Sequence, residues 1–118
     1  MRIGFLGDIQ LGGGMRELCE THGSRFPFEK VHGILEGFDL LIGNMECCVV
    51  REPADYPPNS YPFAVSGNML RTVRGCGVDA LNLANNHILD YGVESLTEAM
   101  SQADVAGVQH FGAGEDLR

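Results

Sequence analysis

The chain has 118 residues, 44% of them hydrophobic, which is the size and composition of one folded domain and argues against a disordered protein. Its formal net charge is −8, and no cluster of Lys and Arg could follow a phosphate backbone, so a nucleic acid is a poor candidate partner. No apolar run is long enough to cross a bilayer and no signal peptide precedes the first apolar run, so we expect a cytoplasmic location.

The first half of the chain predicts two strands and one helix. A short apolar run at 2–7, closed by a Gly-Asp pair, is typical of a buried strand. The three glycines at 12–14 predict a flexible loop. Apolar residues recur at helical spacing over 28–38, which predicts a helix packed on a sheet, and an apolar run at 39–43 predicts the second strand.

The second half continues the alternation after a proline-rich loop at 51–62, which could be a substrate-binding element or a simple spacer. It predicts a helix capped by Ser66 and stopped by Gly75 and Gly77, a strand at 78–84, a helix from Val93 to the stop at Gly107, and a strand at 108–111. Alternating strands and helices indicate an α/β fold with a mainly parallel sheet. Because the last strand has no covering element, we expect a single domain that continues beyond residue 118.

The cysteines have no C-x-x-C spacing and include an adjacent pair; they are Cys19, Cys47, Cys48 and Cys76. This pattern indicates buried or idle thiols rather than a zinc knuckle or a disulfide framework. A cysteine nucleophile paired with His87 would need a cysteine beside that histidine, and nothing in the sequence indicates one.

Polar side chains follow three of the predicted strands at the point where each strand ends. In an open α/β sheet, ligands bind beyond the carboxyl ends of the strands, so polar groups gathered there favour chemistry over packing. The three groups are Asp8 with Gln10, Asn44 with Glu46, and Asn86 with His87 and Asp90. Hard oxygen donors from separated segments are what a divalent metal site requires.

Each group also has a simpler interpretation. Asp8 alone could close a turn, and Asn44 and Glu46 alone could be loop residues that bind backbone groups. Asp90 could either orient His87 or cap the following helix. The coincidence of three such strand ends favours a metal-dependent hydrolase.

Four pieces of the sequence resemble, in order and spacing, the CapA-like family of bacterial poly-γ-glutamate capsule synthesis proteins. They are Gly7-Asp8-Ile9-Gln10-Leu11-Gly12, Gly43-Asn44-Met45-Glu46, Ala84-Asn85-Asn86-His87-Ile88-Leu89-Asp90-Tyr91-Gly92 and Phe111-Gly112-Ala113-Gly114. That family resembles a branch of the calcineurin-like metallophosphoesterases. The resemblance implies that the chain is the front half of their sandwich fold, and the Asn-Asn-His-x-x-Asp-Tyr-Gly stretch carries it most specifically.

The resemblance also implies roles for individual residues. Asp8 matches the first metal-binding aspartate of the phosphoesterases, and Asn86 and His87 match their Asn-His pair, a metal ligand and a histidine that stabilises the transition state. Gln10 stands where that superfamily places a histidine ligand, and Asn44 falls near its bridging aspartate, with Glu46 able to supply the missing charge. These two departures put a standard two-metal centre in doubt.

We therefore expect a metallohydrolase in which a divalent ion (Mn, Zn, Fe or Mg) is held by Asp8, Glu46 and Asn86 with help from Asn44 and Gln10. His87 would stabilise or protonate the reacting oxygen, with Asp90 beside it. The resemblance implies an anionic polymer or a phosphorylated small molecule as substrate, capsule-synthase proteins as partners, and frequent membrane association in the family. The alternatives are a non-catalytic assembly factor with a degraded metal site and, less favoured, a nucleotide-binding domain that uses the 12–14 loop.

Overall fold

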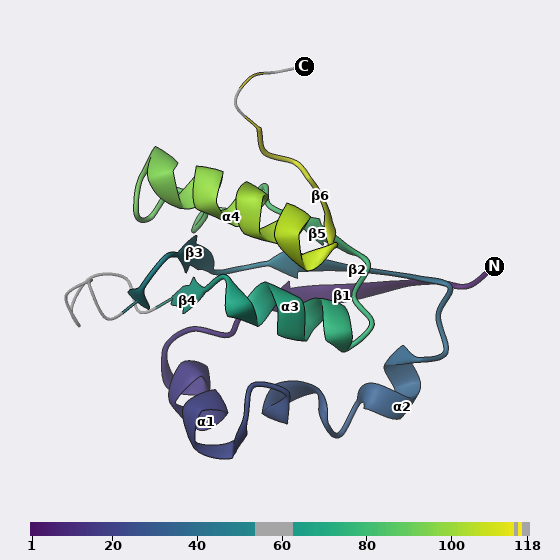
Figure 1. Cartoon of the computed structure of the whole chain (residues 1–118). Helices are drawn as coiled ribbons and strands as arrows, with labels where there is room; N and C mark the ends of the chain where they lie inside the picture. The colour runs from purple at the N-terminus through teal and green to yellow at the C-terminus, as the bar shows by residue number, and fades with distance from the viewer. Residues whose placement is uncertain (54–62, 115, 117–118) are drawn as a thin grey trace.

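Four parallel strands form the central sheet of the computed structural model, which describes residues 1–53, 63–114 and 116 (Figure 1). The strands lie in the order β1-β2-β5-β6, with bounds β1 Ile3–Ile9, β2 Leu40–Met45, β5 Ala80–Asn82 and β6 Gln109–Phe111. Every neighbouring pair in this sheet is parallel. The predicted α/β fold with a mainly parallel sheet and flanking helices is confirmed.

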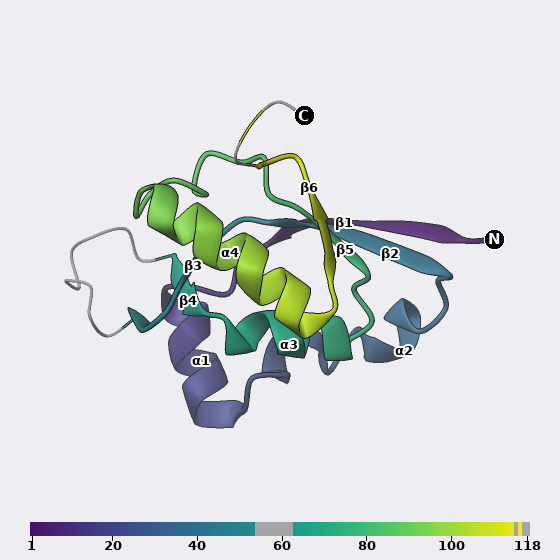
Figure 2. The same ribbon diagram turned by 45° about the horizontal axis from the view of Figure 1, so that its top comes forward.

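The helices pack on one side of this sheet (Figures 1 and 2). They are α1 Gly14–His22, the 3-10 turn η1 Phe26–Phe28, α2 His32–Leu35, α3 Asn68–Gly75 and α4 Val93–Ala106. Because the spatial order of the strands follows the chain order, right-handed crossovers place all the connecting helices on the same face. None of the helices that the structure describes is long and apolar enough to cross a membrane.

A second, smaller sheet pairs β3 Cys48–Val50 with β4 Ala64–Ser66, also in parallel. Neither strand was predicted; the two flank the proline-rich segment at 51–62 and pair with each other apart from the central sheet. The predicted loop at 51–62 falls largely on residues 54–62, which lie outside the described part of the chain.

The predicted helix over 28–38 is wrong. The chain instead forms the 3-10 turn η1, which has Pro27 in its first turn, and the four-residue helix α2. Glycines at 33 and 37 disfavour a continuous helix, and Ile34, on the predicted apolar face, is 68% exposed. Of the predicted apolar stripe, Phe28 and Leu35 do reach the core, whereas Ile34 does not.

The starts of α1 and α3 differ from the predictions, whereas the end of α4 agrees with them. Helix α1 begins at Gly14, where a flexible loop was predicted, and its one buried residue, Cys19, gives little apolar periodicity. Helix α3 follows Gly67, whereas the predicted cap, Ser66, is the last residue of β4. The predicted stop of α4 at Gly107 is confirmed, since this residue has the left-handed φ of 71° that favours glycine.

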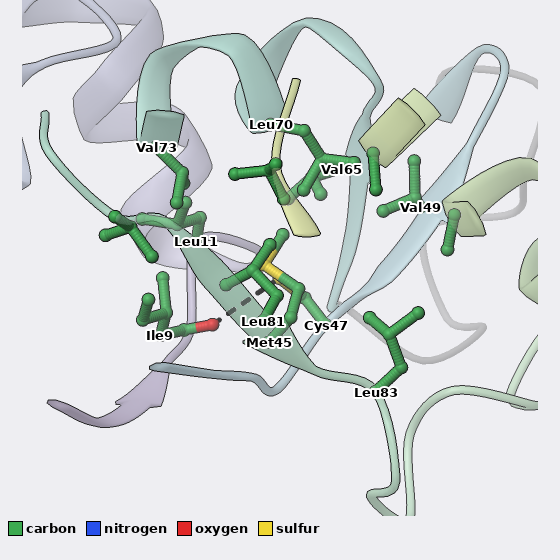
Figure 3. Close-up of a cluster of buried hydrophobic side chains, with 14 of the residues drawn as sticks. Ile9, Leu11, Met45, Cys47, Val49, Val65, Leu70, Val73, Leu81 and Leu83 are labelled. Atoms are coloured by element: carbon green, nitrogen blue, oxygen red, sulfur yellow. Dashed lines mark hydrogen bonds between the residues drawn. The ribbon is translucent and has the colours of Figure 1, made fainter. Parts of the chain in front are cut away.

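The core lies between the sheet and the helices, and Figure 3 shows its central side chains. Leu41 and Met45 of β2 are buried on the helix-facing side of the sheet, whereas Ile42 between them is only half-buried. Cys47 lies in the same cluster, with its Sγ 3.7 Å from the backbone oxygen of Ile9. All four cysteines are buried and free, as predicted.

The described residues leave the opposite face of the central sheet largely uncovered. Ile3 and Phe5 of β1 are 45% and 76% exposed, and Phe111 of β6 is 47% exposed. Leu40 and Ile42 of β2 are half-buried beside them. One face of the sheet is therefore packed and the other presents apolar side chains.

This contrast predicts different costs for truncation on the two faces. Leu81→Ala, at a fully buried position of β5, should lower the free energy of unfolding by about 2–5 kcal/mol, because it leaves a cavity in the core. Phe5→Ala, at a side chain that is 76% exposed, should change it by only about 0.5 kcal/mol. Urea unfolding followed by circular dichroism checks both values, and equal losses would contradict the one-sided core.

The buried thiol of Cys47 predicts a loss of stability at alkaline pH. Burial raises the pKa of the Cys47 thiol from its ordinary value of 9.0 to about 12, so the unfolded chain loses this proton at a lower pH than the folded chain. A raised folded pKa gives stability that is complete below the unfolded pKa and is lost as the pH rises toward the folded pKa. In Cys47→Ala this loss is absent, so the stability gap between wild type and variant should narrow between about pH 8 and about pH 11. Urea unfolding across this range tests it, and a constant gap would count against it.

Candidate functional site

Three polar side chains form a row across β1, β2 and β5 near the carboxyl ends of these strands. In the register of the sheet Asp8 lies opposite Asn44, and Asn44 lies opposite Asn82. Both β1 and β2 extend two residues beyond their predicted ends, so Asp8 and Asn44 stand within the strands. Directly paired residues of parallel strands point to the same face, and here that face is the one opposite the helices.

A β-bulge in β1 sets the direction of Asp8. Phe5 pairs with Ile42 and Asp8 pairs with Asn44, so three steps along β1 match two steps along β2. Such a bulge inserts one extra residue into a strand and shifts which side chains share a face. Without it, strict alternation would place Asp8 on the face opposite that of Phe5.

The amide of Asn44 joins the two carboxylates of the site. Its Nδ2 donates to Asp8 Oδ1 at 2.8 Å and to Glu46 Oε2 at 2.5 Å. Its Oδ1 accepts a hydrogen bond of 2.9 Å from Asn82 Nδ2. Among the residues described, neither carboxylate forms an ion pair with a basic group. Two negative charges therefore converge on one neutral amide nitrogen.

His87 lies in the turn after β5, with its ring held on two sides. Its Nδ1 is 2.6 Å from Asp90 Oδ2, and the Phe63 ring packs against it in a T-shaped arrangement with the ring centroids 4.7 Å apart. The side chains of His87 and Asp90 are 20% and 11% exposed. Because Nδ1 faces Asp90, the other ring nitrogen, Nε2, is the one left for a reacting group.

Asp90 does not cap the following helix. The residue before α4 is Gly92, and this end of the helix has no side-chain capping bond. The sequence allowed Asp90 either to cap this helix or to orient His87, and the structure shows the contact with His87.

In the described part of the chain, two of the predicted ligands form no hydrogen bond with the carboxylates. The Oε1 of Gln10 accepts a hydrogen bond of 2.6 Å from the backbone nitrogen of Gly12, so this side chain closes its own turn. Asn86 is exposed, and no hydrogen bond joins its side chain to another residue in the described ranges. The structure thus brings together Asp8, Asn44 and Glu46, and places His87 with Asp90.

Four side chains that support this region, Asn82, Asn85, Cys48 and Ser95, were not predicted from the sequence. Asn85 donates to the backbone oxygen of Met45 at 2.7 Å and accepts from the backbone nitrogen of His87 at 3.0 Å. The Sγ of Cys48 donates to the backbone oxygen of His87, and Ser95 Oγ donates to that of Ile88 at 3.0 Å. The alternation of β5 could have indicated Asn82, but the contacts of Cys48 and Ser95 depend on β3 and α4 and leave no local signal.

Cys48 contacts the turn of His87 but is not a nucleophile paired with its ring. Its contact is with the backbone oxygen of His87, while the ring faces Asp90 and Phe63. Burial also raises the pKa of the Cys48 thiol, which disfavours the reactive thiolate.

The donors at this site suit a hard divalent cation in kind more than in number. Carboxylate and amide oxygens are the ligands that such cations prefer. Within the described ranges, no group of three His, Cys, Asp or Glu side chains gathers to hold a metal ion. Asp8 and Glu46 are therefore the anionic pair that could hold one ion, with water or further residues completing its coordination.

Comparison with known proteins finds one family and several relatives whose names agree with it. The family described as bacterial capsule synthesis protein PGA_cap matches residues 2–118. The chain is 28% identical to "Capsule biosynthesis protein CapA" of Bacillus anthracis and 26% identical to "PGA biosynthesis protein CapA" of Bacillus subtilis, over 97% and 96% of its length. Over 79% of its length it is 35% identical to "Probable polyglutamine synthesis accessory protein" of Mycobacterium tuberculosis.

The chain spans 28%, 30% and 25% of the lengths of these three relatives. The match to the family nevertheless covers nearly all of this chain, and it includes every residue of the site described above. The CapA-like resemblance of the sequence is confirmed, and the chain belongs to the bacterial capsule synthesis protein family PGA_cap.

Proposed function

We propose that this chain acts in the synthesis of a polyglutamate capsule as a divalent-metal-dependent hydrolase of the phosphoesterase type. Its substrate is an anionic polymer or a phosphorylated small molecule, and its partners are capsule-synthase proteins. The names of its relatives support the capsule and polyglutamate context. The observation that carries the proposal is the convergence of the Asp8 and Glu46 carboxylates on the Asn44 amide. This cluster lies at the carboxyl ends of β1 and β2, and His87 is in the turn after the neighbouring strand β5.

The charge of this cluster favours a bound cation. Two carboxylates share one neutral donor and have no basic partner among the described residues. A divalent ion would offset their mutual repulsion, and it would do so more strongly than an amide can. It would also help a chain of net charge −8 to attract an anionic substrate.

The residues take distinct roles in this proposal. Asp8 and Glu46 hold the ion, with the Asn44 oxygen and Asn86 as further donors after rearrangement of the amides. When bound, the ion supplies Lewis-acid activation of water at neutral pH. His87 donates a proton or a hydrogen bond from Nε2 to the reacting oxygen, and Asp90 holds the ring in the orientation that this requires.

Metal titration tests the ion site. Isothermal titration with Mn²⁺ should show binding to the wild type, and Asp8→Asn and Glu46→Gln should each weaken it at least about tenfold, because each removes an anionic donor. Glu17→Gln is the matched control, since Glu17 is an exposed carboxylate on α1 and its loss should leave the affinity unchanged. The absence of Mn²⁺ binding, or equal affinity in all four proteins, would contradict the proposal.

A non-catalytic assembly role is the second candidate, and the geometry of two side chains favours it. Asn44 puts an amide where a two-metal centre would need a carboxylate, and the Gln10 side chain accepts a hydrogen bond from Gly12 within its own turn. In this case the chain keeps the family fold to bind a polymer or a synthase and performs no hydrolysis. The nucleotide-binding alternative has less support, because the backbone nitrogen of Gly12, which could bind a phosphate, already donates to Gln10 Oε1.

Activity separates the two candidates. With Mn²⁺ present, a hydrolase should cleave bis(p-nitrophenyl) phosphate or poly-γ-glutamate, and His87→Ala should lower the rate by about 10²-fold or more because the proton donor is lost. His22→Ala, which removes an exposed histidine of α1, should leave the rate unchanged. Equal rates in the wild type and His87→Ala would contradict the hydrolase, and Mn²⁺ binding without any hydrolysis would favour the assembly role.

A further inference from the structure

We infer that Asn85 is a positioning residue that fixes His87 relative to the carboxylates of Asp8 and Glu46, an inference that rests on the proposed function. Asn85 belongs neither to the carboxylate cluster nor to the His87–Asp90 pair. Its side chain is half-buried between the end of β2 and the turn that follows β5. Among the residues that the structure describes, Asn85 is the one whose side chain forms hydrogen bonds both to the segment of the carboxylate cluster and to His87.

The amide nitrogen of Asn85 binds β2. Nδ2 donates to the backbone oxygen of Met45 at 2.7 Å and lies 3.4 Å from Asn44 Oδ1. In the sequence, Met45 lies between Asn44 and Glu46, which form the cluster together with Asp8. The turn after β5 is thereby tied to the segment that carries the carboxylate of Glu46 and the bridging amide.

The amide oxygen of Asn85 binds His87. It accepts a hydrogen bond of 3.0 Å from the backbone nitrogen of His87, while the backbone oxygen of the same residue accepts one from Cys48 Sγ. Side chains thus bind both polar backbone groups of His87, although the residue lies outside any strand or helix. Ser95 of α4 holds the next residue, Ile88, through its backbone oxygen.

An amide suits this position because it donates on one side and accepts on the other. An aspartate would keep the acceptor for His87 but would lose the donor to Met45, and an alanine would lose both. The simpler role of satisfying half-buried backbone groups would affect stability alone. A positioning role must also move the ring of His87, and catalytic groups are sensitive to displacements of about 1 Å.

Nuclear magnetic resonance of the chain labelled at histidine and phenylalanine tests this role without an activity assay. Two readouts are measured in the wild type, Asn85→Ala and Asn85→Asp. The first, without metal, is the nuclear Overhauser contact between the rings of His87 and Phe63, whose centroids lie 4.7 Å apart. The second is the broadening of the His87 ring signals on addition of Mn²⁺, which reports the distance from the ion to the ring.

We expect Asn85→Ala to lose the ring contact and to change the broadening of the His87 signals, while it keeps the far-ultraviolet circular dichroism spectrum of the wild type. Asn85→Asp, which is nearly isosteric, should lose the ring contact in part, and it provides the test if Asn85→Ala fails to fold. Asn68→Ala, at an exposed asparagine of α3, is the control and should keep both signals.

The outcomes separate this inference from the proposed function. A wild type without Mn²⁺ binding or broadening would contradict the proposed metal site, and the metal-free contact with Phe63 would still test the role of Asn85. Unchanged ring contact in a folded Asn85→Ala or Asn85→Asp would overturn the positioning role, whatever the metal result.

Discussion

The parallel hydrogen bonding of β1 with β2, and of β2 with β5, is the interaction on which the rest of the site depends. Its register brings Asp8, Asn44 and Asn82 into one row, although they come from distant parts of the chain. The helices pack against the other face of the sheet and fix this register by burying Leu41, Met45 and Leu81. The polar row is thus aligned by an apolar core on the far side of the sheet.

Local signals predicted much of the fold. The positions of β1, β2, β5, β6 and α4 followed from short apolar runs, a long helical stripe and the glycine at 107. The helix over 28–38 failed because spacing alone does not say whether an apolar face meets a core, and Ile34 does not. Helix α1 was missed because it has a single buried residue, and strands β3 and β4 because their pairing across the proline-rich segment at 51–62 leaves no local pattern.

The site was predictable where topology alone decides which residues meet. Strand ends of a parallel sheet share an edge, and this rule brought Asp8, Asn44 and Glu46 together, with His87 following the neighbouring strand β5. Topology does not choose between adjacent residues of a turn. Asn86 was the predicted ligand, whereas Asn85 is the asparagine whose side chain contacts β2. Nor does topology reveal that Gln10 bonds within its own turn, because a close backbone N–H competes with any more distant partner.

The bulge in β1 also bears on how the chain finds its alignment. A slip of one residue between β1 and β2 would turn the carboxylate of Asp8 toward the apolar side of the sheet. An unpaired charge buried there would cost several kcal/mol, far more than a misplaced apolar side chain. The acidic side chain of Asp8 therefore disfavours a pairing of β1 with β2 that is out of register by one residue.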